Sequence, residues 1–416
     1  MQKQLFLFLS ILINSFLGFS QNIFSLQKTL QVARENNPVL KTEILNIGII
    51  QSDLITAKLR PNPKLNNQSL QLMNTNLYPV STNWSSAKNR QVWWQVTKVF
   101  QLPSQMQYKI DVANQRISLA EKQYKENERT VFVEVASKWL EIWNAQKKLD
   151  ILQIANANID TLTKINQLKF KNQVITQTEL FRTELLAKQY DLQLKTAKQE
   201  VSNRLKELRF LIGVQDSISI DKEDNFLFSI PKNLDSLLSE SIKERTDIQV
   251  SKSIIEVSNS NIGLQKAMVF PQPELGFIWN PQNTIPYFGV FATVELPVFS
   301  RNQGEIKKAY AQKEQAEIRL TTAENQLKTE IQVAFSNYRT NEQNVENYKP
   351  VIEQSQLILD NVKYAYLKGG TTIIDFLEAQ RSWLETQQNY YNTLFEYKKG
   401  YIQLLYTTGL INKLAQ

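Results

Sequence analysis

One stretch decides the fold: residues 300–367 read SRNQGEIKKAYAQKEQAEIRLTTAENQLKTEIQVAFSNYRTNEQNVENYKPVIEQSQLILDNVKYAYL. The stretch contains one proline, Pro350, and one glycine, Gly304. Apolar residues recur at three- and four-residue steps with Lys, Glu and Gln between them, which predicts a helix with a narrow apolar seam. The seam comprises Ile306, Ala309, Ala316, Leu320, Ala323, Leu327, Ala334 and Tyr338. Such a helix would be roughly 100 Å long, so it needs partner helices of similar length.

A second long helix is predicted over residues 104–169, because apolar residues recur there by heptads. Its seam includes Ile110, Ile117, Tyr124 and Val131. A short turn and a return helix follow each long helix, over residues 176–211 in the first half and 372–408 in the second. Short segments with a two-residue period precede each long helix and predict β-hairpins. These strands are expected over about 64–73, 90–101, 274–280 and 287–297.

The two halves keep a constant register along their helices. Gly409 and Gly213, Asp375 and Glu179, and Tyr366 and Phe170 are each separated by 196 residues. A constant offset over such a length indicates tandem copies of one unit. We therefore predict a mainly α protein with a small β part, built from two copies of helix, β-hairpin, long helix and return helix. The expected domains are a signal peptide over 1–20, a first repeat over 21–213, a linker over 214–232 and a second repeat over 233–416.

The N-terminus has the pattern of a secretory signal peptide. Lys3 precedes an apolar run from Leu5 to Phe16, and cleavage is expected near Ser20. A membrane anchor is the alternative, although the run is short for a membrane span. Since no other stretch has eighteen consecutive apolar residues, we predict an exported chain without a transmembrane helix.

The composition excludes several classes of protein. Cysteine and histidine are both absent, which excludes disulfides, thiol nucleophiles, histidine-based catalytic triads and histidine metal sites. Beyond the predicted signal peptide only Met73, Met106 and Met268 remain as soft ligands, so no metal site is expected. Lys and Arg exceed Asp and Glu by 48 − 40 = 8, but the charges are interspersed, which disfavours nucleic-acid binding. No enzyme and no cofactor are predicted.

The predicted strands alternate in a way that suits a membrane barrel. Apolar residues occupy one face of residues 287–297 and polar or small residues occupy the other, as in a barrel with lipid outside and water inside. The apolar face comprises Phe288, Val290, Ala292, Val294 and Leu296, and the candidate aromatic girdle comprises Trp84, Trp93, Trp94, Trp279 and Tyr287. Four strands are too few to close a barrel, so several chains would share one. The alternative is a core hairpin packed on a helix.

Two stretches carry a family resemblance: YFGVFATVELPVFSRNQGEIKKA at 287–309 and YLKGGTTIIDFLEAQ at 366–380. Weaker matches are Arg245-Thr246-Asp247-Ile248 and Pro271-Gln272-Pro273-Glu274-Leu275. With the duplicated order of elements, they make the chain from Leu26 to Leu410 resemble the outer-membrane efflux protein (TolC) family. The second copy resembles ducts of heavy-metal cation pumps as much as ducts of drug pumps, so the cargo stays open.

The resemblance implies a homotrimer in the outer membrane of a Gram-negative bacterium. Three times four strands would close a 12-stranded outer-membrane β-barrel in contact with lipid, on a long periplasmic α-helical barrel. Such a channel is a passive exit duct from periplasm to exterior. Its expected partners are a periplasmic adaptor (membrane fusion protein) and an inner-membrane pump.

The resemblance also assigns residues to the narrow helical end. An acidic ring that constricts the pore falls on Asp375 and Glu378, with Glu179 as the acid of the first copy. Tyr366 falls where the family has a tyrosine that latches neighbouring helices. In the first copy Arg182 occupies the position that corresponds to Glu378, and it is expected to pair with a neighbouring acid. Capping is the alternative for Asp375, because Thr372 and Asp375 have the spacing of a capping box, as do Thr176 and Glu179.

The two helical turns are expected to meet the adaptor. They comprise Lys171, Asn172, Gln173 and Val174 in the first copy and Lys368, Gly369, Gly370 and Thr371 in the second. Without the family they would be ordinary hairpin turns. The rival for the whole chain is an exported structural coiled-coil or cell-surface protein, which explains the long helices but not the strand pairs at matched places.

Overall fold

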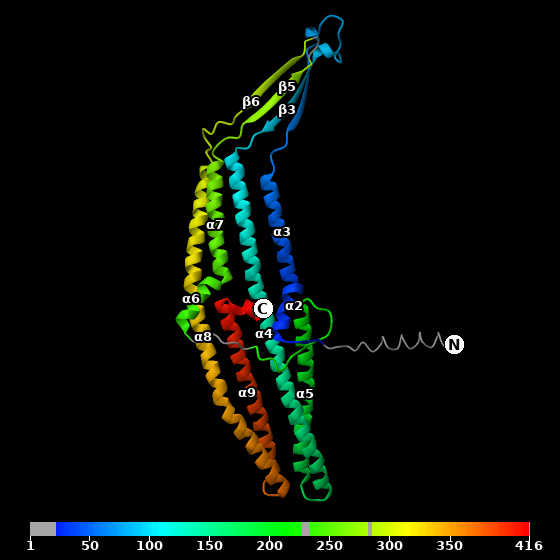
Figure 1. Cartoon of the computed structure of the whole chain (residues 1–416). Coiled ribbons are helices and arrows are strands. Elements are labelled where there is room, and N and C mark those ends of the chain that lie inside the picture. Colours follow the sequence, from blue (N-terminus) through cyan, green and yellow to red (C-terminus); the bar gives the residue numbers. More distant parts are fainter. Residues whose placement is uncertain (1–21, 227–232, 282–284, 416) are drawn as a thin grey trace, which may run out of the picture. The chain divides into compact units, whose positions relative to one another are not determined.

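The computed structural model describes residues 22–226, 233–281 and 285–415, so the predicted signal peptide lies outside the described residues. The fold is mainly helical with a small β part, as predicted (Figure 1). The chain forms two compact units. Unit 1 comprises the segments up to Glu43, Tyr124–Thr246 and from Glu324 onward; unit 2 comprises Ile44–Gln123 and Asp247–Ala323.

Unit 2 contains an antiparallel sheet with the strand order β2-β3-β5-β6. The strands are β2 (Lys64–Gln71), β3 (Arg90–Val99), β5 (Glu274–Asn280) and β6 (Tyr287–Thr293). The β3–β5 pairing joins two hairpins that are far apart in sequence, with Trp94 opposite Trp279. Among the residues that the structure describes, β2 and β6 each have one neighbouring strand, so the sheet is open at both edges.

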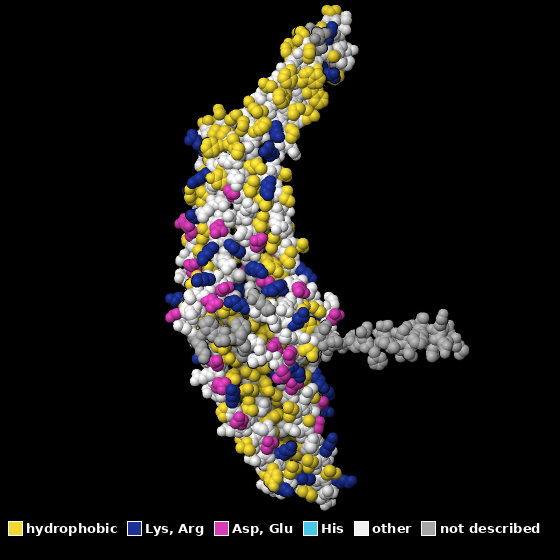
Figure 2. All heavy atoms as spheres, viewed as in Figure 1, with side chains coloured by type: hydrophobic (Ala, Val, Ile, Leu, Met, Phe, Trp, Pro, Cys, Tyr) yellow, Lys and Arg dark blue, Asp and Glu magenta, His cyan; other side chains and the backbone are white. Residues whose placement is uncertain are grey.

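One face of this sheet is exposed and mainly apolar on β3, β5 and β6, although it also carries Asn67, Ser69 and Lys98. Its members come from all four strands and include Leu65, Trp94, Val96, Leu275, Phe277, Trp279, Phe288 and Val290. Figure 2 shows hydrophobic side chains gathered over this part of the chain. The opposite face of β2 and β3 carries Asn66, Gln95 and Thr97 instead.

The strand predicted over 287–297 is shorter than expected. It ends at Thr293, which pairs with Glu274, the first residue of β5. Pro273 precedes that residue, and a proline offers no donor to continue the ladder. Val294 and Leu296 therefore lie beyond the strand rather than on its apolar face. The first hairpin is also slightly shorter than predicted, since β2 ends at Gln71 and β3 at Val99.

Unit 1 contains two helical hairpins, whose long helices begin in unit 2 (Figure 1). Helix α4 (Pro103–Lys171) is followed by α5 (Gln177–Leu211), and α8 (Gln303–Lys368) by α9 (Ile373–Thr408). Pro350 lies inside α8 but is exposed, so the carbonyl that loses its donor can bond to water. Buried apolar residues of all four helices form one cluster that includes Ile159, Leu186, Leu359 and Trp383.

Several shorter elements of unit 1 lie near the return helices α5 and α9. They are β1 (Asn22–Phe24), α2 (Leu26–Asn36), β4 (Ile218–Ile220), α6 (Leu234–Glu244) and the 3₁₀ helix η3 (Leu410–Ala415). The segment predicted as a linker contributes β4, which pairs in parallel with β1; residues 227–232 of that segment lie outside the described residues. Two further helices are α3 (Pro38–Lys58) and α7 (Thr246–Ala267). None of the helices in residues 22–226, 233–281 and 285–415 combines the length and apolar character that a membrane crossing needs.

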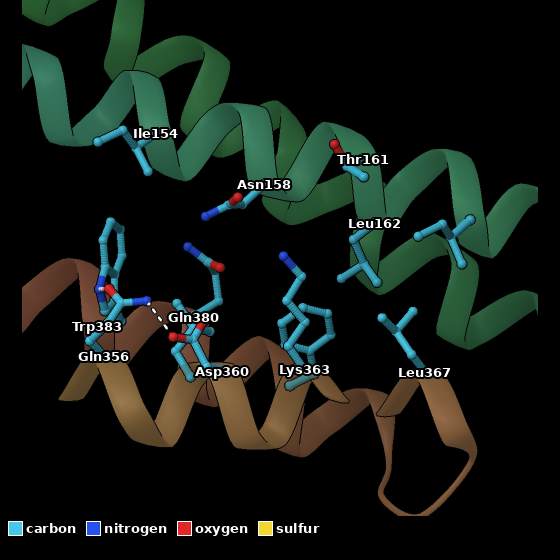
Figure 3. A pocket seen from close by; sticks show the side chains of 13 residues that line it. Ile154, Asn158, Thr161, Leu162, Gln356, Asp360, Lys363, Leu367, Gln380 and Trp383 are labelled. Carbon is cyan, nitrogen blue, oxygen red and sulfur yellow. Dashed lines mark hydrogen bonds between the residues drawn. The ribbon is translucent and has the colours of Figure 1, made fainter. Parts of the chain in front are cut away.

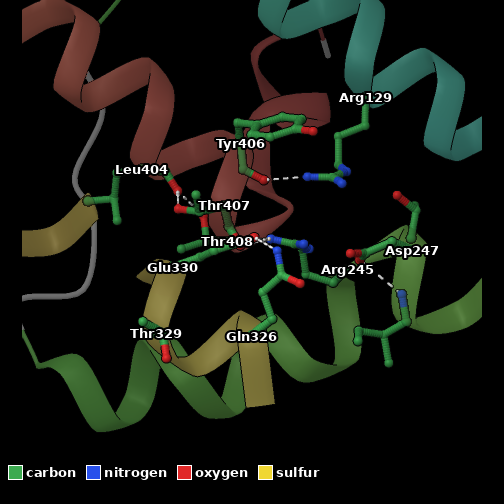
Figure 4. A network of polar contacts seen from close by, with 12 residues as sticks. Arg129, Arg245, Asp247, Gln326, Thr329, Glu330, Leu404, Tyr406, Thr407 and Thr408 are labelled. Carbon is green, nitrogen blue, oxygen red and sulfur yellow. Dashed lines mark hydrogen bonds and ion pairs between the residues drawn. The ribbon is translucent and has the colours of Figure 1, made fainter. Parts of the chain in front are cut away.

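Two buried arginines stabilise the C-terminal end of α9 (Figure 4). Arg129 donates to the carbonyl of Tyr406 over 2.8 Å, and Arg245 donates to the carbonyl of Thr407 over 2.7 Å. Arg245 also pairs with Glu330 at 3.2 Å. Carbonyls in the last turn of a helix lack intrahelical partners, so these arginines supply the missing donors. The Arg245-Thr246 motif therefore has a structural role in unit 1.

Candidate functional site at the helical turns

The two turns between long and return helices have the same backbone conformation. Gln173 and Gly369 both adopt positive φ, 58° and 78°. Val174 N donates to the carbonyl of Lys169 and Gly370 N to the carbonyl of Ala365, each over 2.8 Å. These six-to-one bonds are those of a Schellman helix end. Glycine adopts positive φ at little cost, whereas a residue with a side chain such as Gln173 is strained there.

The residues predicted to meet the adaptor are mostly exposed. Lys171 and Lys368 are the last residues of α4 and α8, and the turns begin after them. Thr371 is partly buried, and its hydroxyl donates to the Asp375 carboxylate over 2.7 Å. The remaining members, Asn172, Gln173, Val174, Gly369 and Gly370, are exposed.

Both return helices begin with a complete capping box. Thr176 Oγ1 accepts from Glu179 N while the Glu179 carboxylate accepts from Thr176 N. Thr372 and Asp375 form the same pair of bonds. The hydroxyls of Thr371 and Thr372, and the Thr372 N–H, hold the pKa of the Asp375 carboxyl below its usual value by hydrogen bonding to the ionised form. The capping role of both acids is therefore realised.

The predicted charges of this region are mostly exposed. Asp375 and Glu378 lie one turn apart near the start of α9, and both are exposed. Arg182 is also exposed, and within the described ranges no acid lies within ion-pair distance of it. The same residues contain no group of three or more acidic side chains arranged to hold a metal ion.

Tyr366 is buried and joins both hairpins of one chain. Its hydroxyl donates to Asn166 Oδ1 over 2.7 Å, and Asn166 Nδ2 donates to Thr183 Oγ1 over 2.8 Å. Phe376 packs against the tyrosine ring, with centroids 5.5 Å apart, and Lys169 Nζ lies 4.2 Å from the ring centroid. Burial raises the pKa of the Tyr366 hydroxyl, so it stays protonated and donates.

Sequence reasoning missed Asn166 and Thr183, although one signal was available. Asn166 lies five heptads after Val131 and so occupies the apolar seam position of α4. It is fully buried. A lone asparagine in such a seam often sets the register between helices. The polar chain Tyr366–Asn166–Thr183 therefore determines how α8 sits against α4 and α5 near the turns.

Comparison with known proteins agrees with this architecture. Residues 237–410 match the model of the family described as outer membrane efflux protein. The pyoverdine export outer membrane protein OpmQ of Pseudomonas putida is 22% identical over 273 residues, covering 62% of this chain and 57% of OpmQ. The probable outer membrane lipoprotein SilC of Salmonella typhimurium is 21% identical over 193 residues, covering 43% of this chain and 41% of SilC. The matched regions thus span about half the length of these relatives.

Among solved structures, the fold is similar to that of CusC, which has been described in terms of folding and transmembrane channel formation. The TM-score is 0.77 at 16% identity, with 94% of each chain covered. At this identity the likeness shows the fold alone, and it extends over both halves of the chain, beyond the family match in the second half. The second half of the chain therefore matches the outer membrane efflux protein family over residues 237–410, and the chain as a whole has the same fold as CusC.

Proposed function

We propose that this chain is the exit duct of a tripartite efflux system. It conducts substrates passively from periplasm to exterior when docked to a periplasmic adaptor and an inner-membrane pump. The observation that carries the proposal is the sheet of unit 2, which has a mainly apolar exposed face and two open edges. A soluble protein would cover such a face and protect such edges, whereas a shared membrane barrel uses both.

The open edges support a homotrimer. If β6 of one chain pairs with β2 of the next, three chains close a 12-stranded barrel. The exposed apolar side chains then face lipid. Return helix α5 and long helix α8 also expose apolar side chains, among them Phe181, Leu185 and Leu192 on α5 and Leu357 and Tyr364 on α8. These faces would pack between neighbouring chains of the helical barrel.

Several local features support the tandem duplication. The left-handed residues Gln173 and Gly369 are 196 positions apart, as are Gly213 and Gly409, which also have positive φ. The two capping boxes have the same offset. A shared origin explains why unrelated local details recur at one spacing.

The turn residues keep their proposed roles at the narrow end. Asp375 and Glu378, with Glu179 from the first copy, would form an acidic ring that favours cations in a closed pore. Arg182 would pair with an acid of a neighbouring chain, and Tyr366 would latch the hairpins. The adaptor would dock on the two turns and the helix ends beside them, at Lys171, Asn172, Gln173, Val174, Lys368, Gly369, Gly370 and Thr371.

Disulfide trapping tests the shared barrel, and the chain is suited to it because it contains no cysteine. Asn67→Cys on β2 is combined in turn with cysteines at Phe288, Val290 and Ala292 on β6, because the register between chains is open. We expect at least one pair to give a ladder ending at a trimer on a non-reducing gel of outer-membrane protein. The matched control combines Asn67→Cys with Lys252→Cys on α7. A stable folded monomer, or equal crosslinking in the control, would refute the trimer.

A further inference from the structure

A cavity of about 210 Å³ lies in unit 1 between α4 and the α8/α9 hairpin (Figure 3). Its walls include the buried apolar side chains of Leu162, Leu359, Phe376 and Trp383. Polar side chains from three helices project into the same space. Cavities between helices with apolar walls and a few convergent polar groups are common ligand sites.

Gln380 is the most unusual residue of this cavity. Its side chain is 2% exposed, and its Nε2 has no hydrogen-bond partner among the described residues. Figure 3 shows the amide pointing across the cavity toward Asn158 of α4. Buried donors in native proteins are nearly always paired, so an unpaired one that points into a cavity indicates a missing acceptor.

The neighbouring polar groups define what that acceptor is. Lys363 lines the same cavity and brings an ammonium group. Asp360 also lines the cavity, and its carboxylate accepts from Gln356 Nε2 over 3.0 Å. Gln356 in turn accepts from Trp383 Nε1 over 2.7 Å. The unpaired Gln380 amide and the Lys363 ammonium are both donors and together favour an anionic oxygen, while the negative charge of Asp360 offsets the positive charge of Lys363.

We propose that this cavity binds a small amphipathic carboxylate. The carboxylate accepts from Gln380 Nε2 and pairs with Lys363, while an aryl or short alkyl group packs against Phe376 and Leu162. Because the lining residues come from α4, α8 and α9, the bound molecule links the two hairpins of one chain. The proposal rests on this cavity alone and is independent of whether the chain works as an exit duct.

Equilibrium dialysis of the purified full-length protein against radiolabelled phenylacetate, a probe with about ten non-hydrogen atoms, tests the site. Both compartments contain the same detergent, so partition into micelles cancels. We expect phenylacetate to bind saturably. The neutral analogue phenylacetamide should bind at least tenfold more weakly. Lys363→Met and Gln380→Leu should each weaken phenylacetate binding at least tenfold, and Thr161→Trp, which fills the cavity from its rim, should abolish it.

Lys164→Met is the matched control, because Lys164 is an exposed lysine on α4 outside the cavity. It should bind phenylacetate like the unmodified protein. Circular dichroism of every variant confirms that the helices are retained. No saturable binding, equal affinity for the amide, or an equal loss in Lys164→Met and Lys363→Met would each overturn the proposal.

Discussion

Replacing Tyr366 by phenylalanine tests whether the polar chain of Tyr366, Asn166 and Thr183 holds the hairpins together. The substitution removes one hydroxyl and keeps the ring against Phe376. Asn166 is fully buried, so its Oδ1 loses its donor without gaining water. A buried acceptor left unpaired costs about 1–3 kcal/mol. Opening of the α8–α9 turn should therefore become about 5- to 150-fold more favourable.

Amide hydrogen exchange is the suitable assay, because a large protein with two units is not expected to unfold in one step. Exchange should accelerate in residues 362–376 and in the facing part of α4. Tyr364→Phe is the matched control, because Tyr364 is 66% exposed and is not a member of the polar chain Tyr366–Asn166–Thr183. Equal exchange in Tyr366→Phe and Tyr364→Phe would refute the reasoning. The double variant Asn166→Leu/Tyr366→Phe should lose less free energy of opening than the sum of the two single variants, because neither the Asn166 amide nor the Tyr366 hydroxyl is then left unpaired.

Three further predictions concern the same region. Replacing Asp375 by Asn and Glu378 by Gln should remove cation preference in planar bilayers while the trimer persists, since Asn can still cap the helix; unchanged selectivity would leave both acids with structural roles only. Hydrogen bonds lower the pKa of Asp375 below 3.8, so its capping contribution to stability is present above about pH 4. The contribution should be lost as the pH falls through the lowered pKa, and amide exchange at the start of α9 should then become faster. Gln173→Gly should slow amide exchange in the turn after α4, because it relieves about 1 kcal/mol of strain in the left-handed conformation. Gly369→Gln should accelerate amide exchange in the turn after α8. Changes of the same sign in the two variants would contradict the shared turn geometry.

The sequence alone determined the features that depend on local pattern. The long helices follow from a 3.6-residue period that is almost free of glycine and proline, and both capping boxes follow from a three-residue spacing. The presence of strands β2 and β6 follows from local pattern, although both were predicted longer, over about 64–73 and 287–297. Local propensity and periodicity act within a few residues, so they are visible without the fold.

Other features depended on which segments meet, and only the tertiary structure decided them. The end of β6 at Thr293 is set by where its partner β5 begins, not by its own residues. The pairing of β3 with β5, the bonding of Asn166 to Tyr366, and the unpaired amide of Gln380 each join residues separated by long stretches of chain. Contacts of this kind are selected by packing of the whole unit, because a buried polar group is stable only where the fold brings its partner.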